Sequence, residues 1–80
     1  MDDTTLHARI NALAHEEEGL YAEAAAGPLA PVQLARMHAI RLELDQAWDL
    51  LRQRQALRSA GLDPDEAHVR PVAVVEAYEQ

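Results

Sequence analysis

The stretch Glu43-Leu-Asp-Gln-Ala-Trp-Asp-Leu-Leu-Arg-Gln-Arg-Gln-Ala-Leu-Arg58 decides the fold of this chain of 80 residues. It contains neither Gly nor Pro, is rich in residues of high helix propensity, and carries the only Trp of the chain. Upstream of it, Pro31 suits the first position of a helix, and downstream Gly61 suits the position after a helix end. Steps of three and four residues between apolar positions indicate a helix with one buried face. The sequence therefore predicts a helix over residues 31–59 with a stripe of Leu34, Met37, Arg41, Leu44, Trp48 and Leu51.

A second helical pattern precedes this one. Asp3, Thr4 and Thr5 are residue types that cap the N-termini of helices. At the other end, Gly27 suits the left-handed position after a helix and Pro28 cannot continue one. The sequence predicts a helix over about residues 4–26, whose stripe is Leu6, Ile10, Leu13, Glu17, Leu20 and Ala24.

The short connection between the two helices predicts an antiparallel hairpin. A single register then satisfies all six layers, and it brings the only acid of the first stripe, Glu17, opposite the only base of the second, Arg41. We predict that this polar pair fixes the register, as buried polar residues do in coiled coils. The remaining layers give the predicted hairpin core, which consists of Leu6, Ile10, Leu13, Leu20, Leu34, Met37, Leu44, Trp48 and Leu51.

The second helix also carries an apolar line that the first helix cannot cover. Residues 61–80, here called the C-terminal arm, contain apolar side chains and a Pro-Asp-Glu sequence that predicts one helical turn at about residues 64–68. Either this arm or a second subunit has to cover the line, and we expect a homodimer with a four-helix arrangement. The candidate residues for the dimer or arm interface are Leu42, Leu50, Leu57, Val72, Val75 and Tyr78.

Composition limits the possible functions. Eighty residues make one small domain, and with no Cys neither disulfides nor thiolate metal sites are available to stabilise it. The net charge of −7 argues against nucleic-acid binding and against anionic membranes, both of which favour a basic surface. No apolar run approaches the roughly 20 residues that a membrane span needs. We therefore expect a soluble cytoplasmic protein.

Two groups of side chains are candidates for a binding site. His15 and Glu18 resemble part of a metal site, but Gly19 stands where a zinc-hydrolase helix would need its second His. The other group, Arg52, Arg54 and Arg58, could hold a phosphate or carboxylate, although a structural ion network is the simpler interpretation. No catalytic triad or phosphate-binding loop is present in the sequence, so we predict no enzyme activity and no cofactor.

The central stretch, together with the later Asp63-Pro64-Asp65-Glu66, is similar to a family of small actinobacterial proteins catalogued as domain of unknown function 2630. The segment from Val69 to Tyr78 and the acidic run Glu16-Glu17-Glu18 also fit that family. The resemblance implies a free-standing actinobacterial protein and no particular activity.

From these observations we expect a non-enzymatic helical protein that acts as a homo-oligomeric interaction or assembly module with a protein partner. The alternative is a protein that binds a small ligand or metal through His15 and Glu18 or through the three arginines.

Overall fold

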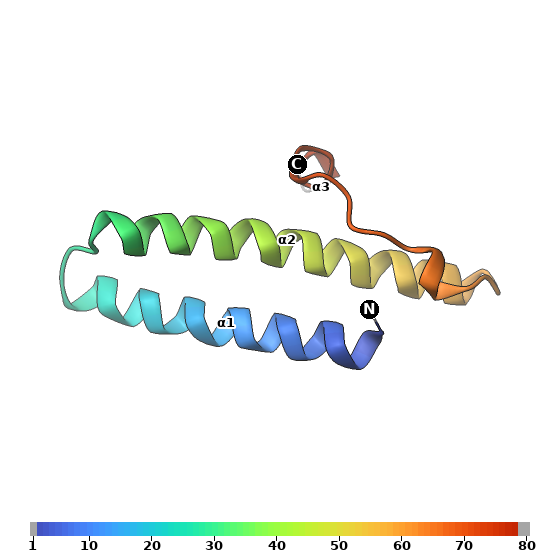
Figure 1. Cartoon of the computed structure of the whole chain (residues 1–80), viewed down its shortest axis with the longest axis horizontal. Helices are drawn as coiled ribbons and strands as arrows, with labels where there is room; N and C mark the ends of the chain where they lie inside the picture. Colours follow the sequence, from blue (N-terminus) through green and yellow to red (C-terminus); the bar gives the residue numbers. More distant parts are fainter. Residues whose placement is uncertain (1, 79–80) are drawn as a thin grey trace.

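The computed structural model describes residues 2–78, without the side chain of Tyr78, and the described chain is helical or irregular with no strand (Figure 1). Its elements are α1 (Asp3–Ala26), α2 (Pro31–Ser59), the short 3₁₀ helix η1 (Pro64–Glu66) and α3 (Val72–Tyr78). α1 and α2 run antiparallel side by side, and α2 packs against each of the other three elements (Figure 1). The predicted two-helix hairpin is therefore present, and its second helix is the element on which the rest of the chain assembles.

The ends of the two long helices follow local rules. Asp2, rather than a later residue, caps α1, since its carboxylate accepts a hydrogen bond from the backbone N–H of Thr5 at 2.8 Å. At the end of α2, Gly61 has a φ of 76°, and the N–H of Leu62 donates to the carbonyl of Leu57 at 2.8 Å. This is the left-handed ending expected there.

The connection between α1 and α2 differs from the prediction. Gly27 has a φ of 169°, which is extended backbone, so it does not adopt the left-handed conformation expected for it. Gln33 joins the two ends instead: its Oε1 accepts from the N–H of Ala30 at 2.8 Å, and its Nε2 donates to the carboxylate of Glu23. Pro28 ends α1 without requiring special glycine geometry.

The side of α2 that faces α1 coincides only in part with the predicted stripe. Of the nine predicted core residues, the structure buries Leu6, Ile10, Leu13, Leu44 and Leu51 and half-buries Leu20 and Met37. Trp48 and Leu34 are instead 43% and 53% exposed, whereas Ile40 and Ala47 are buried. A small side chain at position 47 lets the helices approach closely, which a Trp between them would prevent. The prediction that Trp48 and Leu34 belong to the core is therefore wrong.

The Glu17–Arg41 pair is also less enclosed than expected. Arg41 Nη1 lies 3.9 Å from Glu17 Oε2, so the two charges attract without a hydrogen bond. The Glu17 side chain is largely buried, while Arg41 reaches into solvent. The structure places the two side chains near each other at the edge of the helix pair, and they do not form a buried layer.

Other ion pairs join the helices along one flank. Arg36 donates two hydrogen bonds to Glu16, at 2.6 and 2.8 Å, and Arg9 Nε donates to Glu43 at 2.8 Å. The paired arginine holds the pKa of Glu16 below its ordinary value. All four side chains are substantially exposed, so we expect these pairs to favour the observed register more than they add stability.

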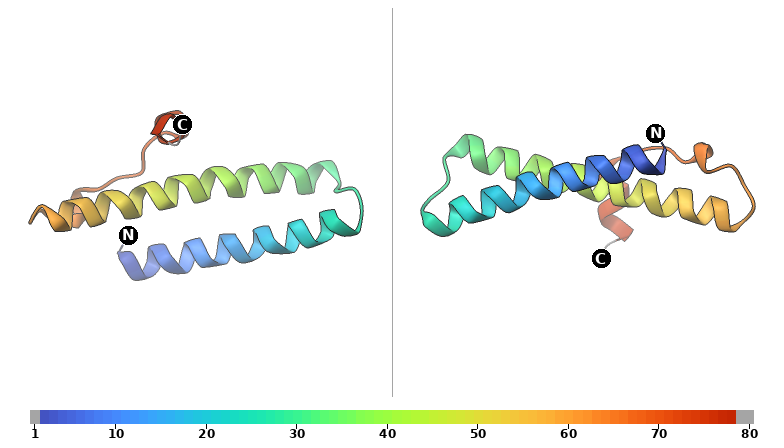
Figure 2. Two further views of the ribbon diagram at one scale, coloured as in Figure 1. Left: turned by 180° about the vertical axis from the view of Figure 1, so that it is seen from behind. Right: turned by 90° about the horizontal axis from the view of Figure 1, so that it is seen from below.

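The molecule is long and thin, with Cα extents of 49 × 25 × 17 Å (Figure 2). Its radius of gyration is 14.9 Å, against about 12 Å for a compact domain of 80 residues. In Figure 1 η1 overlaps α2, while the segment that leads to α3, and α3 itself, lie on the side of α2 away from α1. In the part of the chain that the structure describes, the helices therefore form one layer, and no second layer packs on its two broad faces.

Candidate functional site

The C-terminal arm is attached to α2 by a nearly buried ion pair. The Asp49 side chain is 3% exposed and accepts two hydrogen bonds from the guanidinium of Arg70, one of them from Nε at 2.9 Å. Gln53 Nε2 donates a third hydrogen bond to Asp49, also at 2.9 Å. These donors favour the charged carboxylate, and Arg70 is the main reason that the pKa of Asp49 lies below its ordinary value.

Two glutamines of α2 hold the backbone of the arm. Gln46 Nε2 donates to the carbonyl of Arg70 at 3.1 Å, and Gln53 Nε2 donates to the carbonyl of His68 at 2.9 Å. Residues 67–70, before α3, are irregular, so their backbone carbonyls have no hydrogen bonds within a helix or sheet. The two glutamine side chains supply hydrogen bonds to two of these carbonyls. Val75 of α3 is fully buried and completes the attachment.

Arg54 ties the N-terminus, α2 and η1 together. Its Nε donates to Asp3 at 2.5 Å, and its Nη1 donates to Asp65 at 2.9 Å and to the carbonyl of Pro64 at 3.3 Å. Hydrogen bonding with Asp3 raises the pKa of Arg54 and lowers that of Asp3. Arg58 adds a second contact to Asp3 at 3.0 Å. Arg54 and Arg58 are therefore occupied by carboxylates of their own chain.

Acidification is expected to detach the arm before the hairpin core is lost. Because the pKa of Asp49 is lowered on folding, its contribution to stability is present above the ordinary value of 3.8 and is lost as the pH falls below it. The protection of the amides of residues 74–77 against exchange, measured relative to the exchange rate of an unfolded chain at the same pH, should fall as the pH is lowered from 6 to 2. In an Asp49→Asn variant the acid-dependent step should be smaller, because the carboxylate that Arg70 holds is gone while Asp3 and Asp65 still pair with Arg54. An unchanged acid step in that variant would contradict the assignment to Asp49.

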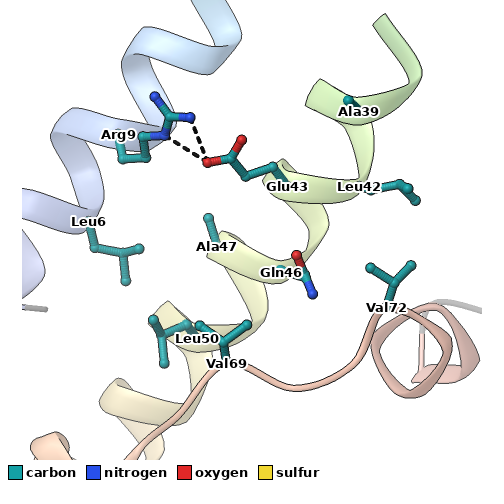
Figure 3. A pocket seen from close by; sticks show the side chains of 10 residues that line it. All are labelled: Leu6, Arg9, Ala39, Leu42, Glu43, Gln46, Ala47, Leu50, Val69 and Val72. Atoms are coloured by element: carbon teal, nitrogen blue, oxygen red, sulfur yellow. Dashed lines mark hydrogen bonds and ion pairs between the residues drawn. The ribbon is translucent and has the colours of Figure 1, made fainter. Parts of the chain in front are cut away.

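Next to the arm lies a groove of about 550 Å³ (Figure 3). Its floor is one side of α2, and its walls are α1 on one side and the arm on the other (Figure 3). The floor positions recur at helical spacing and are mostly apolar; they include Ala39, Leu42, Gln46 and Leu50. Leu6 and Arg9 contribute from α1, Val69 and Val72 from the arm, and Arg9 pairs with Glu43 across the α1 side of the groove (Figure 3).

The predicted interface residues fall into different environments. Leu42, Leu50 and Val72 line the groove, while Val75 is buried where α3 meets α2. Leu57 is half-buried outside the groove lining, and the side chain of Tyr78 lies outside the described residues. The arm thus packs on its own chain and covers only part of the apolar line of α2.

The predicted ligand groups are not assembled into a site. His15 and Glu18 are both exposed on α1, and no group of three or more His, Asp or Glu side chains within residues 2–78 could hold a metal ion. Arg52 is exposed, whereas Arg54 is buried and paired, so the three arginines do not converge on an open anion site. No helix in the described part of the chain is long and apolar enough to cross a membrane.

Sequence reasoning missed the pair Asp49–Arg70 and the part of α1 in the groove. Asp49 stands between Trp48 and Leu50 in a strongly apolar stretch, and that position was the available hint that its side chain is buried. α3 was also missed, although Pro71 followed by Val72 and Val75 is compatible with a helix start. Its first hydrogen bond joins the N–H of Val74 to the carbonyl of Pro71 at 3.0 Å.

Comparisons with known proteins identify relatives without a known activity. A family model described as "Protein of unknown function (DUF2630)" matches residues 2–80. An uncharacterized protein of Mycobacterium bovis is 47% identical over 78 residues, which cover 96% of this chain and 88% of that protein. Uncharacterized proteins from two strains of Mycobacterium tuberculosis match to the same extent. No solved structure matches this chain.

Proposed function

The chain belongs to the family described as "Protein of unknown function (DUF2630)", and we propose that it is a non-enzymatic homodimeric module for protein interaction or assembly. The observation that carries the proposal is the single-layer shape, only 17 Å across its shortest axis. Stable domains bury their elements between at least two packed layers. A second hairpin would supply the missing layer and complete a four-helix arrangement.

The exposed surface supports this proposal. The accessible surface is 5371 Å², whereas a compact monomer of this mass exposes about 4,800 Å². The excess of nearly 600 Å² is close to the roughly 500 Å² per partner that a small specific interface requires. Within residues 2–77, seven large apolar side chains are exposed, Trp48 and Tyr21 among them. A role in binding other proteins explains why so much apolar surface is left outside the core.

We expect the purified protein to have twice the mass of the chain in solution. Sedimentation velocity over a hundredfold range of concentration should give a dimer, and the midpoint of thermal unfolding should rise with concentration because dissociation accompanies unfolding. A strict monomer at every concentration would overturn the proposal, as would a monomer that retains stoichiometric metal after purification.

A further inference from the structure

We propose that the groove is the dimer contact and that α1 of a second copy lies in it, with the two hairpins related by a two-fold axis parallel to the helices. This inference rests on the homodimer proposed above. It adds the surface, the segment that occupies it and the orientation of the two copies.

The charge distribution favours the groove as the contact between two copies. The chain carries a net charge of −7, so two copies repel each other over most of their surface. The groove lining contains one cation, Arg9, and one anion, Glu43, and is otherwise uncharged. It is therefore an apolar and locally neutral surface on an acidic molecule. Two copies can meet there with little of the repulsion that opposes contact elsewhere.

The shape of the groove matches a helix. From Ala39 to Leu50 the floor extends about 16 Å along α2, which is three helical turns. A groove of this form accepts a helix. α1 is suited to it because Thr5, Ala8 and Ala12, on the exposed side of α1 next to Arg9, have short side chains. Short side chains allow a second helix to approach closely.

Two-fold symmetry lets both grooves be filled at once. In a two-fold dimer every contact occurs twice, so α1 of each copy can lie in the groove of the other. With the axis parallel to the helices, α1 of the second copy runs antiparallel to α2, as α1 does within one chain. Arg9 of the second copy then comes level with Glu43. Each Arg9 already pairs with Glu43 of its own chain, so two neutral ion pairs meet at the contact and no net charge is brought into it.

The test introduces a charge on the groove floor without disturbing the core. Ala39 lines the groove and is exposed in the single chain, so Ala39→Glu should leave the hairpin folded. Burying this unpaired carboxylate in the dimer should raise the dissociation constant by at least about tenfold. Leu34→Glu is the matched control, since Leu34 is exposed on α2 outside the groove, and its dissociation constant should be close to that of the original chain. Helix content by circular dichroism checks that both variants are folded.

A second experiment tests the orientation. The chain has no Cys, so Ala12→Cys and Ala39→Cys each introduce a single thiol. Mixing the two variants under oxidising conditions should give a covalent heterodimer, and replacing the second by Ala56→Cys, an exposed position outside the groove, should give none.

The possible outcomes separate the two proposals. If the unsubstituted protein is a monomer, the homodimer proposal is wrong, and the groove proposal with it. If Leu34→Glu weakens the dimer and Ala39→Glu does not, the protein is a homodimer but the groove is not its interface. A co-purified apolar small molecule, detected by native mass spectrometry and displaced by Ala39→Glu with no change in dimer mass, would also overturn the groove assignment.

Discussion

Replacing Ile40 by alanine is expected to lower the free energy of unfolding by about 2–5 kcal/mol, which is the range for removing a large aliphatic side chain from a packed core. Ile40 is fully buried in the cluster that α1 and α2 share. The substitution removes three carbon atoms from that cluster and leaves a cavity that two long helices can only partly close. Urea unfolding, followed by circular dichroism at one fixed protein concentration, measures the change.

Leu34→Ala provides the matched control on the same helix. Leu34 is 53% exposed, so its truncation should cost less than about 1 kcal/mol. The apolar periodicity of the sequence predicts the opposite order, because it assigns Leu34 to the core. A larger loss for Leu34 than for Ile40 would mean that α2 is rotated relative to the structure described above.

Replacing Arg70 by methionine is expected to destabilise the attachment of the arm by about 3 kcal/mol, at the low end for removing one member of a buried ion pair. The low end is appropriate because the Arg70 side chain is 30% exposed, so water reaches the site more easily than in a closed core. Asp49 is left almost fully buried without its main partner. The loss should appear as faster amide exchange in α3, with less change in residues of the hairpin core.

A double variant separates loss of the pair from loss of packing. When Asp49→Leu accompanies Arg70→Met, no uncompensated charge remains, and most of the lost stability should return. Gln46 still donates to the arm backbone in that variant. If the double variant is less stable than Arg70→Met alone, the cost arises from lost packing of the arginine side chain and not from the buried charge.

Part of the groove lining could be predicted from the sequence. It indicated that Leu42 and Leu50 on α2 lie outside the hairpin stripe and that Val72 of the arm is available to meet them. These three residues do line the groove. The sequence did not predict that Leu6 and Arg9 of α1 line the groove. Their place in the lining depends on how much of α2 the arm leaves uncovered.

The sequence by itself determined the helices, where they end and the family. Helix propensity, periodicity and the positions of Gly and Pro act over a few residues, so the predicted ranges agree with α1 and α2 to within a residue. The resemblance to the DUF2630 family is confirmed over residues 2–80. Only the tertiary structure decided which side of α2 faces α1, that α3 is helical, and that Asp49 is buried against Arg70. Each of these depends on segments distant in sequence that compete for the surface of one helix. Leu44 and Leu51 belong to the core in the predicted stripe and in the structure alike, so apolar spacing does not decide whether Ala47 or Trp48 lies between them.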